Sequence, residues 1–353
     1  MAVSRGNSVK ASEFNNLQSR IAQILGEGSA DFGYGQSVQS TQIFGPTSAQ
    51  AEDADNILAE HINALRNDIN TAYVHQNGSV MSAGTYQGAG SAANDFPTAN
   101  TADIIGADRS AKSVTVDDQN NYSYTDEDLD KGFNDLLDLM SDIESNRFVI
   151  HPSQQDVQTR ATDERLTNWN GSITSEFTVF FASEDARRFF FNAGGEIRMS
   201  GAVDLGSSEG DSLARDQGWK DMIENPGEVQ FGHNYTTASG SIVGITFPDG
   251  VIGNSQLTSN YQTVFRKDAN SGIYGNSYWK VDAKETSTTS ISFRITLVDD
   301  GPESDSDAGQ PGSSSGGVIE PVTANLEFEY SVRRANGTVV VDIPAYQIIN
   351  TFE

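Results

Sequence analysis

The chain contains 353 residues, with 22 lysines and arginines against 49 aspartates and glutamates, so its formal net charge is −27. This excess of negative charge excludes a general affinity for nucleic acid or for anionic membrane surfaces, because proteins bind both through clustered lysines and arginines. Cysteine is absent, which excludes disulfides, thiolate metal sites and a cysteine nucleophile. The sequence also contains no apolar run of the roughly 18 residues that a membrane-spanning helix needs.

The first 150 residues are predicted to be rich in helix. Apolar residues recur at helical spacing over 12–25, 57–73 and 125–143. Ser12 fits the N-cap of the first helix, and Gly26 is a suitable stop for it. The third helix is expected to begin at Thr125-Asp126-Glu127-Asp128, where acidic residues suit the helix dipole.

The three predicted helices share one short pattern, an apolar residue followed by Asn, any residue and Leu, with another apolar residue four positions later. Two interpretations remain open. Convergent amphipathicity explains the pattern, and so does a repeated helical unit that packs on like helices, including those of neighbouring subunits. The leucines of the pattern are Leu17, Leu65 and Leu136.

Long connections rich in Gly, Ser, Ala and Thr separate these helices, over 26–46 and 78–120. Connections of this length are uncommon inside a compact domain and predict extended arms or surface-hugging segments. We therefore expect the apolar stripes to be poorly buried within one chain and to pack against neighbouring subunits. Leu17, Leu65 and Leu136 are the resulting candidate assembly residues, and an ordinary intrachain bundle is the competing account.

Beyond residue 150 the pattern changes to short runs in which apolar and polar residues alternate, which is typical of strands with one buried face. The runs at 173–181 and 291–297 are the clearest. A hairpin is predicted from the strand 326–332 through a tight Asn336-Gly337 turn into 339–341. Shorter strands are expected at 197–203, 242–247, 263–266 and 278–281, with one helix around Trp219, Met222 and Ile223 that stops at Asn225-Pro226-Gly227.

These patterns predict an α+β protein. Residues 1–150 form an α-rich assembly or attachment region with long arms, and residues 151–353 form an antiparallel domain that resembles a β-sandwich or a barrel. The segment 299–317 has five acidic residues and no basic ones, followed by a Gly/Ser tail. We expect it to be a mobile loop.

No catalytic, cofactor-binding or metal-binding site is predicted. The four histidines are dispersed, and His61 and His75 are expected on helix surfaces. Neither a nucleophile elbow nor a phosphate-binding loop is present. Carboxylates in the loop 299–317 offer oxygens to Ca²⁺, but they lack the spacing of an EF-hand. A solvated acidic loop is the preferred interpretation, and Ca²⁺ binding there is left open.

A block of three phenylalanines, Phe189-Phe190-Phe191, is expected to fill a sheet edge or corner before a turn at 192–195. Three arginines, Arg187, Arg188 and Arg198, flank this block in an otherwise acidic chain. Their partners are either acids across a subunit contact or acids of the same chain, so the three are candidate assembly residues.

The stretch 188–198, with the sequence RFFFNAGGEIR, resembles a segment of the virion structural proteins of tailed phages, especially T4-like cyanophages and other marine myophages. Three further segments are similar to the same family, at 26–36, 62–78 and 219–232. The Phe-rich block and the Gly-Tyr-Gly-Gln block at 33–36 are the more specific of these. From Tyr261 onwards only the β character matches.

The resemblance implies a non-enzymatic structural protein of the virion, in the tail, neck or fibre apparatus, that is assembled in the host cytoplasm. Its expected partners are further copies of itself and other virion proteins, and neither nucleic acid nor membrane. The alternatives are a capsid-surface decoration protein, or a receptor-binding or glycan-binding module of a tail fibre. For glycan binding the candidate platforms are Trp279, Tyr278 and Tyr274, although core packing is the preferred interpretation of these three residues. Stoichiometry and position in the particle are left open.

Overall fold

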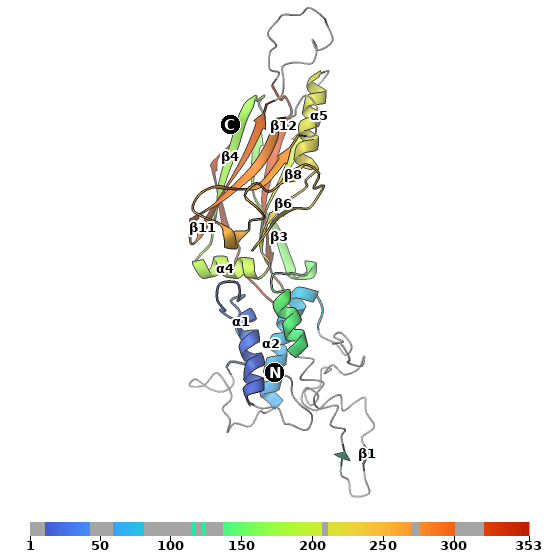
Figure 1. Ribbon diagram of the computed structural model, residues 1–353, viewed down its shortest axis with the longest axis vertical. Helices are drawn as coiled ribbons and strands as arrows, with labels where there is room; N and C mark the ends of the chain where they lie inside the picture. The colour runs from blue at the N-terminus through green and yellow to red at the C-terminus, as the bar shows by residue number, and fades with distance from the viewer. Residues whose placement is uncertain are drawn as a thin grey trace, which may run out of the picture. The chain divides into compact units, whose positions relative to one another are not determined.

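The computed structural model shows an α+β fold, as the sequence predicts, with helices in one part of the chain and two antiparallel sheets in another (Figure 1). It describes residues 11–42, 59–80, 115–116, 122–123, 137–206, 211–269, 276–300 and 321–352. Two compact units are present, which we call the helical unit and the β unit. The helical unit comprises 1–155, 188–194 and 335–341, and the β unit comprises 156–187, 195–334 and 342–353. The first change of unit lies close to the expected boundary at 150, but the chain returns to the helical unit twice.

The helical unit contains α1 (Ala11–Leu25), α2 (Ala59–Asn77) and a third helical segment over 137–145. Helix α1 ends where the sequence predicts: the N–H of Gly26 donates to the Ala22 carbonyl at 2.9 Å, and Gly28 then takes a positive φ of 52°. The predicted start of the third helix, together with Leu136, lies outside the described residues.

The apolar stripes of these helices are buried inside the helical unit. The buried stripe residues are Phe14, Leu17, Ile21, Ile24, Leu25, Leu65, Ile69, Leu139, Met140 and Ile143. An ion pair at 2.8 Å between Arg20 and Glu144 links α1 to the third segment, and the Gln76 amide of α2 donates to the Ile143 carbonyl at 3.0 Å. The expectation that the stripes are poorly buried within one chain is therefore wrong for the described residues, and the intrachain bundle is what forms.

The described part of the first connection is folded against the helices and is not an extended arm. Asp68 of α2 accepts the backbone N–H groups of Gln39 and Ser40 at 2.9 and 2.8 Å, and Tyr34 is buried. The second predicted arm, 78–120, lies largely outside the described residues. Of this segment the structure describes 78–80 and β1 (Thr115–Val116), which pairs antiparallel with β2 (Tyr122–Ser123).

The β unit contains a six-stranded sheet in the order β13-β4-β11-β10-β9-β8 and a five-stranded sheet in the order β3-β12-β5-β6-β7. The strands of the first sheet are β4 (Gly171–Phe180), β8 (Ile245–Thr246), β9 (Gln262–Asp268), β10 (Tyr278–Ser287), β11 (Ser290–Asp299) and β13 (Ala345–Asn350). Those of the second are β3 (Gln155–Arg165), β5 (Glu196–Asp204), β6 (Val229–Phe231), β7 (Thr236–Ala238) and β12 (Asn325–Ala335).

Aromatic side chains from both sheets meet between them, which makes the β unit a sandwich. Phe177 of β4 stacks on Tyr330 of β12 with ring centroids 4.2 Å apart, and Phe231 meets Phe293 edge-on at 5.2 Å. Helix α5 (Asp211–Glu224) packs along β5 and matches the predicted helix before Asn225-Pro226-Gly227. A further short helix, α4 (Glu184–Asn192), precedes β5.

Two local predictions are wrong. The phenylalanine block lies in α4 and not at a sheet edge, because Ser183 caps Ala186 N–H and Glu184 and Asp185 favour a helix start. The segment 339–341 does not return as a hairpin partner of β12, whose neighbours are β3 and β5.

The failure of the hairpin has a local cause in the geometry of the turn. Only one bridge, between Asn336 and Val340, closes it, and Gly337 does not take the positive φ of a tight hairpin turn. After Pro344 the chain joins the other sheet as β13. The expected strand at 242–247 is reduced to the two residues of β8. The proposed mobile loop lies outside the described residues from 301 onwards.

Candidate functional site

The predicted assembly leucines do not form a surface. Leu17 and Leu65 are at most 1% exposed in the core of the helical unit, and Leu136 lies outside the described residues. Substituting them would disturb the fold of this unit before it disturbed a contact with another chain. These leucines therefore do not provide a contact surface for a neighbouring chain.

Three segments that carry the resemblance to virion proteins converge in the helical unit, and we call them the loop cluster: residues 26–36, 75–78 and 188–194. The guanidinium of Arg188 donates to the carbonyl oxygens of Glu27 and Phe32, at 2.7 Å for the latter. The Asn192 amide donates to the carbonyls of Ala30 and Gly33 at 3.1 and 3.3 Å. Side chains from one segment thus satisfy backbone groups of another segment that lies about 160 residues away, since the sequence separations are 156 to 162.

Glycines in the first segment allow this close approach. Gly33 has φ of 100°, and a Cβ there would lie 2.2 Å from the Glu27 carbonyl oxygen. Gly35 has φ of 70°, and its Cβ would lie 2.4 Å from the Phe189 ring. Both positions therefore exclude other residues, by conformation and by space.

Tyr34, between the two glycines, is the centre of the loop cluster. Its hydroxyl donates to the Arg147 carbonyl at 2.5 Å and accepts from the Gln76 amide at 3.3 Å, and its ring lies 5.1 Å from the His75 ring. Burial raises the pKa of the Tyr34 hydroxyl well above its usual range. The tyrosine is therefore a neutral, hydrogen-bonded anchor of the cluster.

The prediction that His61 and His75 lie on helix surfaces is wrong, because both are buried. Burial lowers the pKa of His75 to about 4, against an opposing hydrogen bond with the Ala193 backbone. His75 is therefore a neutral core residue at physiological pH.

The two arginines of the β unit have internal partners, which is one of the two alternatives that the sequence allows. Arg187 pairs with Glu285 at 2.7 Å, and burial lowers the pKa of Arg187 while Glu285 opposes that shift. Arg198 pairs with Glu196 at 2.8 Å and with Glu228 at 2.9 Å. These pairs stabilise the sandwich.

The aromatic residues proposed as sugar platforms separate into three cases. Trp279 is fully buried, and its indole N–H donates to the Met222 carbonyl at 2.9 Å, so it has the core-packing role that the sequence favours and is not an exposed platform. Tyr274 lies outside the described residues. Tyr278 is half-buried on the outward face of the six-stranded sheet, where the Arg266 guanidinium lies 3.8 Å from its ring centroid.

That outward face carries a continuous polar row across five strands. The register places Asn350, Glu176, Arg294, Asp282 and Thr263 side by side, from β13 to β9. Burial would raise the pKa of the Asp282 carboxyl, but its contacts with Lys280, Arg294 and Thr263 outweigh that effect and hold it below the usual value.

Tyr261 lies over this row. Its hydroxyl donates to Glu176 at 2.5 Å, and its ring centroid is 4.2 Å from the Arg294 guanidinium. The row is therefore an internally neutralised surface whose charges are already paired.

Among the described residues there is no group of three or more histidines and carboxylates arranged to hold a metal ion. None of the described helices is long and apolar enough to cross a membrane.

Sequence reasoning identified the Gly-Tyr-Gly-Gln block but not what it does. The available signal was the pair of glycines around one aromatic residue, which indicates a tight loop closed over a buried ring. The segment that packs on this block, 188–194, was not predicted as a helix, because three consecutive phenylalanines show no helical spacing.

No protein-family model, no curated protein and no solved structure matches the chain.

Proposed function

We propose that this protein is a non-enzymatic structural protein of a tailed-phage virion, in the tail, neck or fibre apparatus, and that it acts by assembling with copies of itself and with other virion proteins. The observation that carries the proposal is the loop cluster. Segments that resemble virion proteins, about 160 residues apart in the chain, meet in one packed unit. The residues that carry the resemblance to virion proteins therefore contact one another in the folded chain.

The burial of the helix stripes moves the proposed assembly contact to the β unit. The segment between β7 and β9, a loop that contains the two-residue strand β8, exposes three β-branched residues within ten positions: Ile242 at 72%, Val243 at 67% and Val251 at 59%. Exposed apolar side chains that lie this close together in the chain are candidates for a protein contact. A second copy of the chain is the partner proposed for this loop.

Light scattering on the full chain tests the assembly step. Wild type is expected to form a discrete oligomer, and the pair Ile242→Asp with Val243→Asp is expected to give a monomer with an unchanged melt. Leu166→Asp is the matched control, because Leu166 is also in the β unit and 67% exposed. An oligomer that survives the double substitution would overturn the role of this loop.

The location in the virion needs a separate experiment. Antibodies against the recombinant chain should label gradient-purified particles from a lysate that encodes it, and peptides of the chain should appear in those particles at a fixed ratio to the capsid protein. Finding the chain only in the soluble fraction would contradict a structural role.

A second candidate function, glycan binding, is favoured by the outward face of the six-stranded sheet. There Tyr278 is half-exposed, with Asp268 of β9 opposite it and Lys280 between it and Asp282 of the polar row, and polar groups near an aromatic ring suit a sugar. A glycan array with the full chain tests this, with Tyr278→Ala as the variant and Phe180→Ala, on the same face, as the control. Signals that are equal for both variants would exclude this face.

A further inference from the structure

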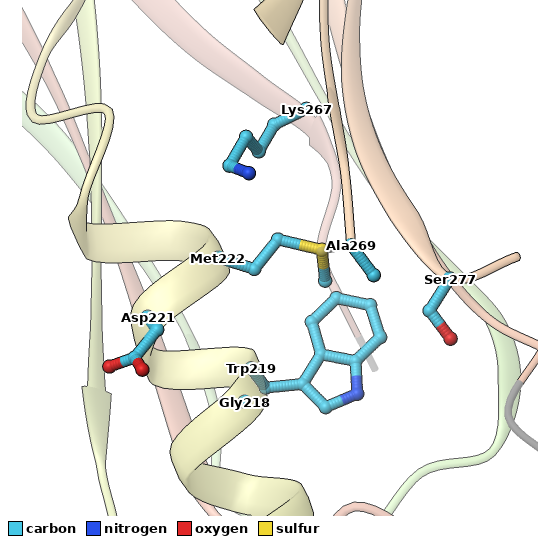
Figure 2. Close-up of a pocket in the computed structure, with 7 residues that line it drawn as sticks. All are labelled: Gly218, Trp219, Asp221, Met222, Lys267, Ala269 and Ser277. Carbon is cyan, nitrogen blue, oxygen red and sulfur yellow. The ribbon is translucent and has the colours of Figure 1, made fainter. Parts of the chain in front are cut away.

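The β unit contains a cavity of about 130 Å³ between helix α5 and the ends of β9 and β10 (Figure 2). Its lining residues are Gly218, Trp219, Asp221, Met222, Lys267, Ala269 and Ser277. An apolar cavity of about 150 Å³ can hold a molecule of the size of benzene. This cavity therefore has room for a ligand of a few non-hydrogen atoms.

The cavity places one buried cation, Lys267, and one carboxylate, Asp221, among apolar side chains. Lys267 is only 3% exposed, and its ammonium donates to the Asp268 carbonyl at 2.9 Å. An ammonium has three donors, and the described residues supply no second acceptor for it. Burial lowers the pKa of Lys267, while the charge of Asp268 opposes the shift.

The remaining walls set the shape and polarity of the ligand. Figure 2 shows the Lys267 side chain reaching over Met222, with the Trp219 ring on the far side of the methionine. The Ser277 hydroxyl is engaged, because it accepts from the Asp300 N–H at 3.1 Å. The Asp221 carboxylate accepts from Gln217 at 2.8 Å and points away from the Trp219 ring. The Lys267 side of the cavity therefore carries the cation and the Trp219 side is apolar, with Asp221 as the one carboxylate among the lining residues that the structure describes.

We propose that this cavity binds a short-chain carboxylate, whose carboxylate pairs with the Lys267 ammonium and whose alkyl chain contacts Trp219 and Met222. A chain with a net charge of −27 repels anions at long range, so an anion bound here has to be held by a local cation. Charge-assisted hydrogen bonds at a buried ammonium supply that attraction. The site is independent of the proposed assembly.

Tryptophan fluorescence and the thermal melt of the full chain test the proposal, because Trp219 lines the cavity. Sodium butyrate is the probe, butyramide is its uncharged analogue of equal size, and sodium chloride controls for ionic strength. We expect butyrate to change the fluorescence saturably and to raise the melting temperature. Butyramide and sodium chloride should have neither effect.

Three variants locate the site. Lys267→Met should weaken butyrate binding about tenfold or more, the value of one charge-assisted hydrogen bond. Lys284→Met removes the same charge from the outward face, where Lys284 lies over Tyr261, and should bind like wild type. Ala269→Leu keeps the lysine but fills the cavity, and should abolish binding even if Lys267→Met fails to fold. Equal binding by Lys267→Met and wild type, or no saturable response to butyrate, would overturn the proposal.

Discussion

The helical unit and the β unit are each stabilised by a different kind of internal contact. In the β unit, side chains of one strand meet those of the next in register, and rings from the two sheets stack between them, as Phe177 does on Tyr330. In the helical unit, side chains capture backbone carbonyls of remote segments, as Arg188 does with Phe32. The packing of strands follows the alternation of apolar and polar residues in the sequence. The capture of backbone carbonyls depends on single residues that belong to no repeating pattern.

The difference decides how each unit responds to substitution. A sandwich core distributes its free energy over many apolar contacts, so the loss of one ring costs the area and the cavity that it leaves. A cluster of backbone contacts depends on close approach, so the addition of a single carbon is enough to disturb it. All three tryptophans, Trp169, Trp219 and Trp279, belong to the β unit, so their fluorescence reports on that unit alone.

The largest effect is expected in the sandwich core. Phe177→Ala should lower the free energy of unfolding of the β unit by about 3–5 kcal/mol, because the ring is fully buried among Phe293, Tyr330 and Tyr346. Denaturant melts followed by tryptophan fluorescence measure it. Phe180→Ala, in the same strand but 40% exposed, should cost less than about 1 kcal/mol. Equal losses would contradict the assignment of the core face.

Gly33→Ala should have the next largest effect, in the helical unit. The added Cβ would meet the Glu27 carbonyl oxygen at 2.2 Å with φ at 100°, and we expect a loss of about 3 kcal/mol. Gly171→Ala is the matched control, because Gly171 also has a positive φ of 75° but nothing within 4 Å of the new carbon. It should cost only about 1 kcal/mol. Far-UV circular dichroism should show an early loss of helix for the first variant alone.

Much of the β unit was predictable, because alternation is a local property of the chain. The runs at 173–181 and 291–297 became β4 and β11, and the expected strands at 197–203, 263–266 and 278–281 became β5, β9 and β10. Strand β13 was missed because it is short, begins directly after Pro344 and has its period interrupted by a bulge at Ile349.

The helical unit was predictable only in part. Helices α1 and α2 follow from their apolar period, and Gly26 stops α1 as expected. The segments that pack against these helices do not follow from the apolar period, because the loop cluster joins segments that are far apart in the sequence. No local pattern indicates that Asn192 donates to Gly33, and the candidate site could not be assembled from the sequence for that reason.

Acid should weaken the helical unit through His75. The unfolded imidazole titrates near 6.5, whereas burial lowers the pKa of the folded residue to about 4. Between these values only the unfolded chain binds the proton, so stability is complete above the unfolded pKa and falls as the pH drops towards the folded one. At pH 5 the loss should be about 2 kcal/mol. Circular dichroism melts against pH should show this slope, and His75→Gln should remove it. An unchanged slope in the variant would assign it to other groups.

The smallest effect is expected for Arg188→Lys, which tests whether the shape of the side chain or its charge holds the loop cluster. Arg188→Lys keeps the positive charge but loses the guanidinium, whose Nη1 donates to both the Glu27 and the Phe32 carbonyls and whose carbon lies 4.6 Å from the Phe189 ring centroid. We expect the helical unit to lose about 1 kcal/mol, the usual value of a hydrogen bond whose partner stays in place. Hydrogen exchange of the amides in 26–36 should rise correspondingly. Arg266→Lys is the control, because its ion pair with Asp268 is about one-third exposed and such pairs contribute less than about 1 kcal/mol. If both substitutions leave amide exchange unchanged, the guanidinium of Arg188 does not hold the loop, and the glycines alone must account for its close approach.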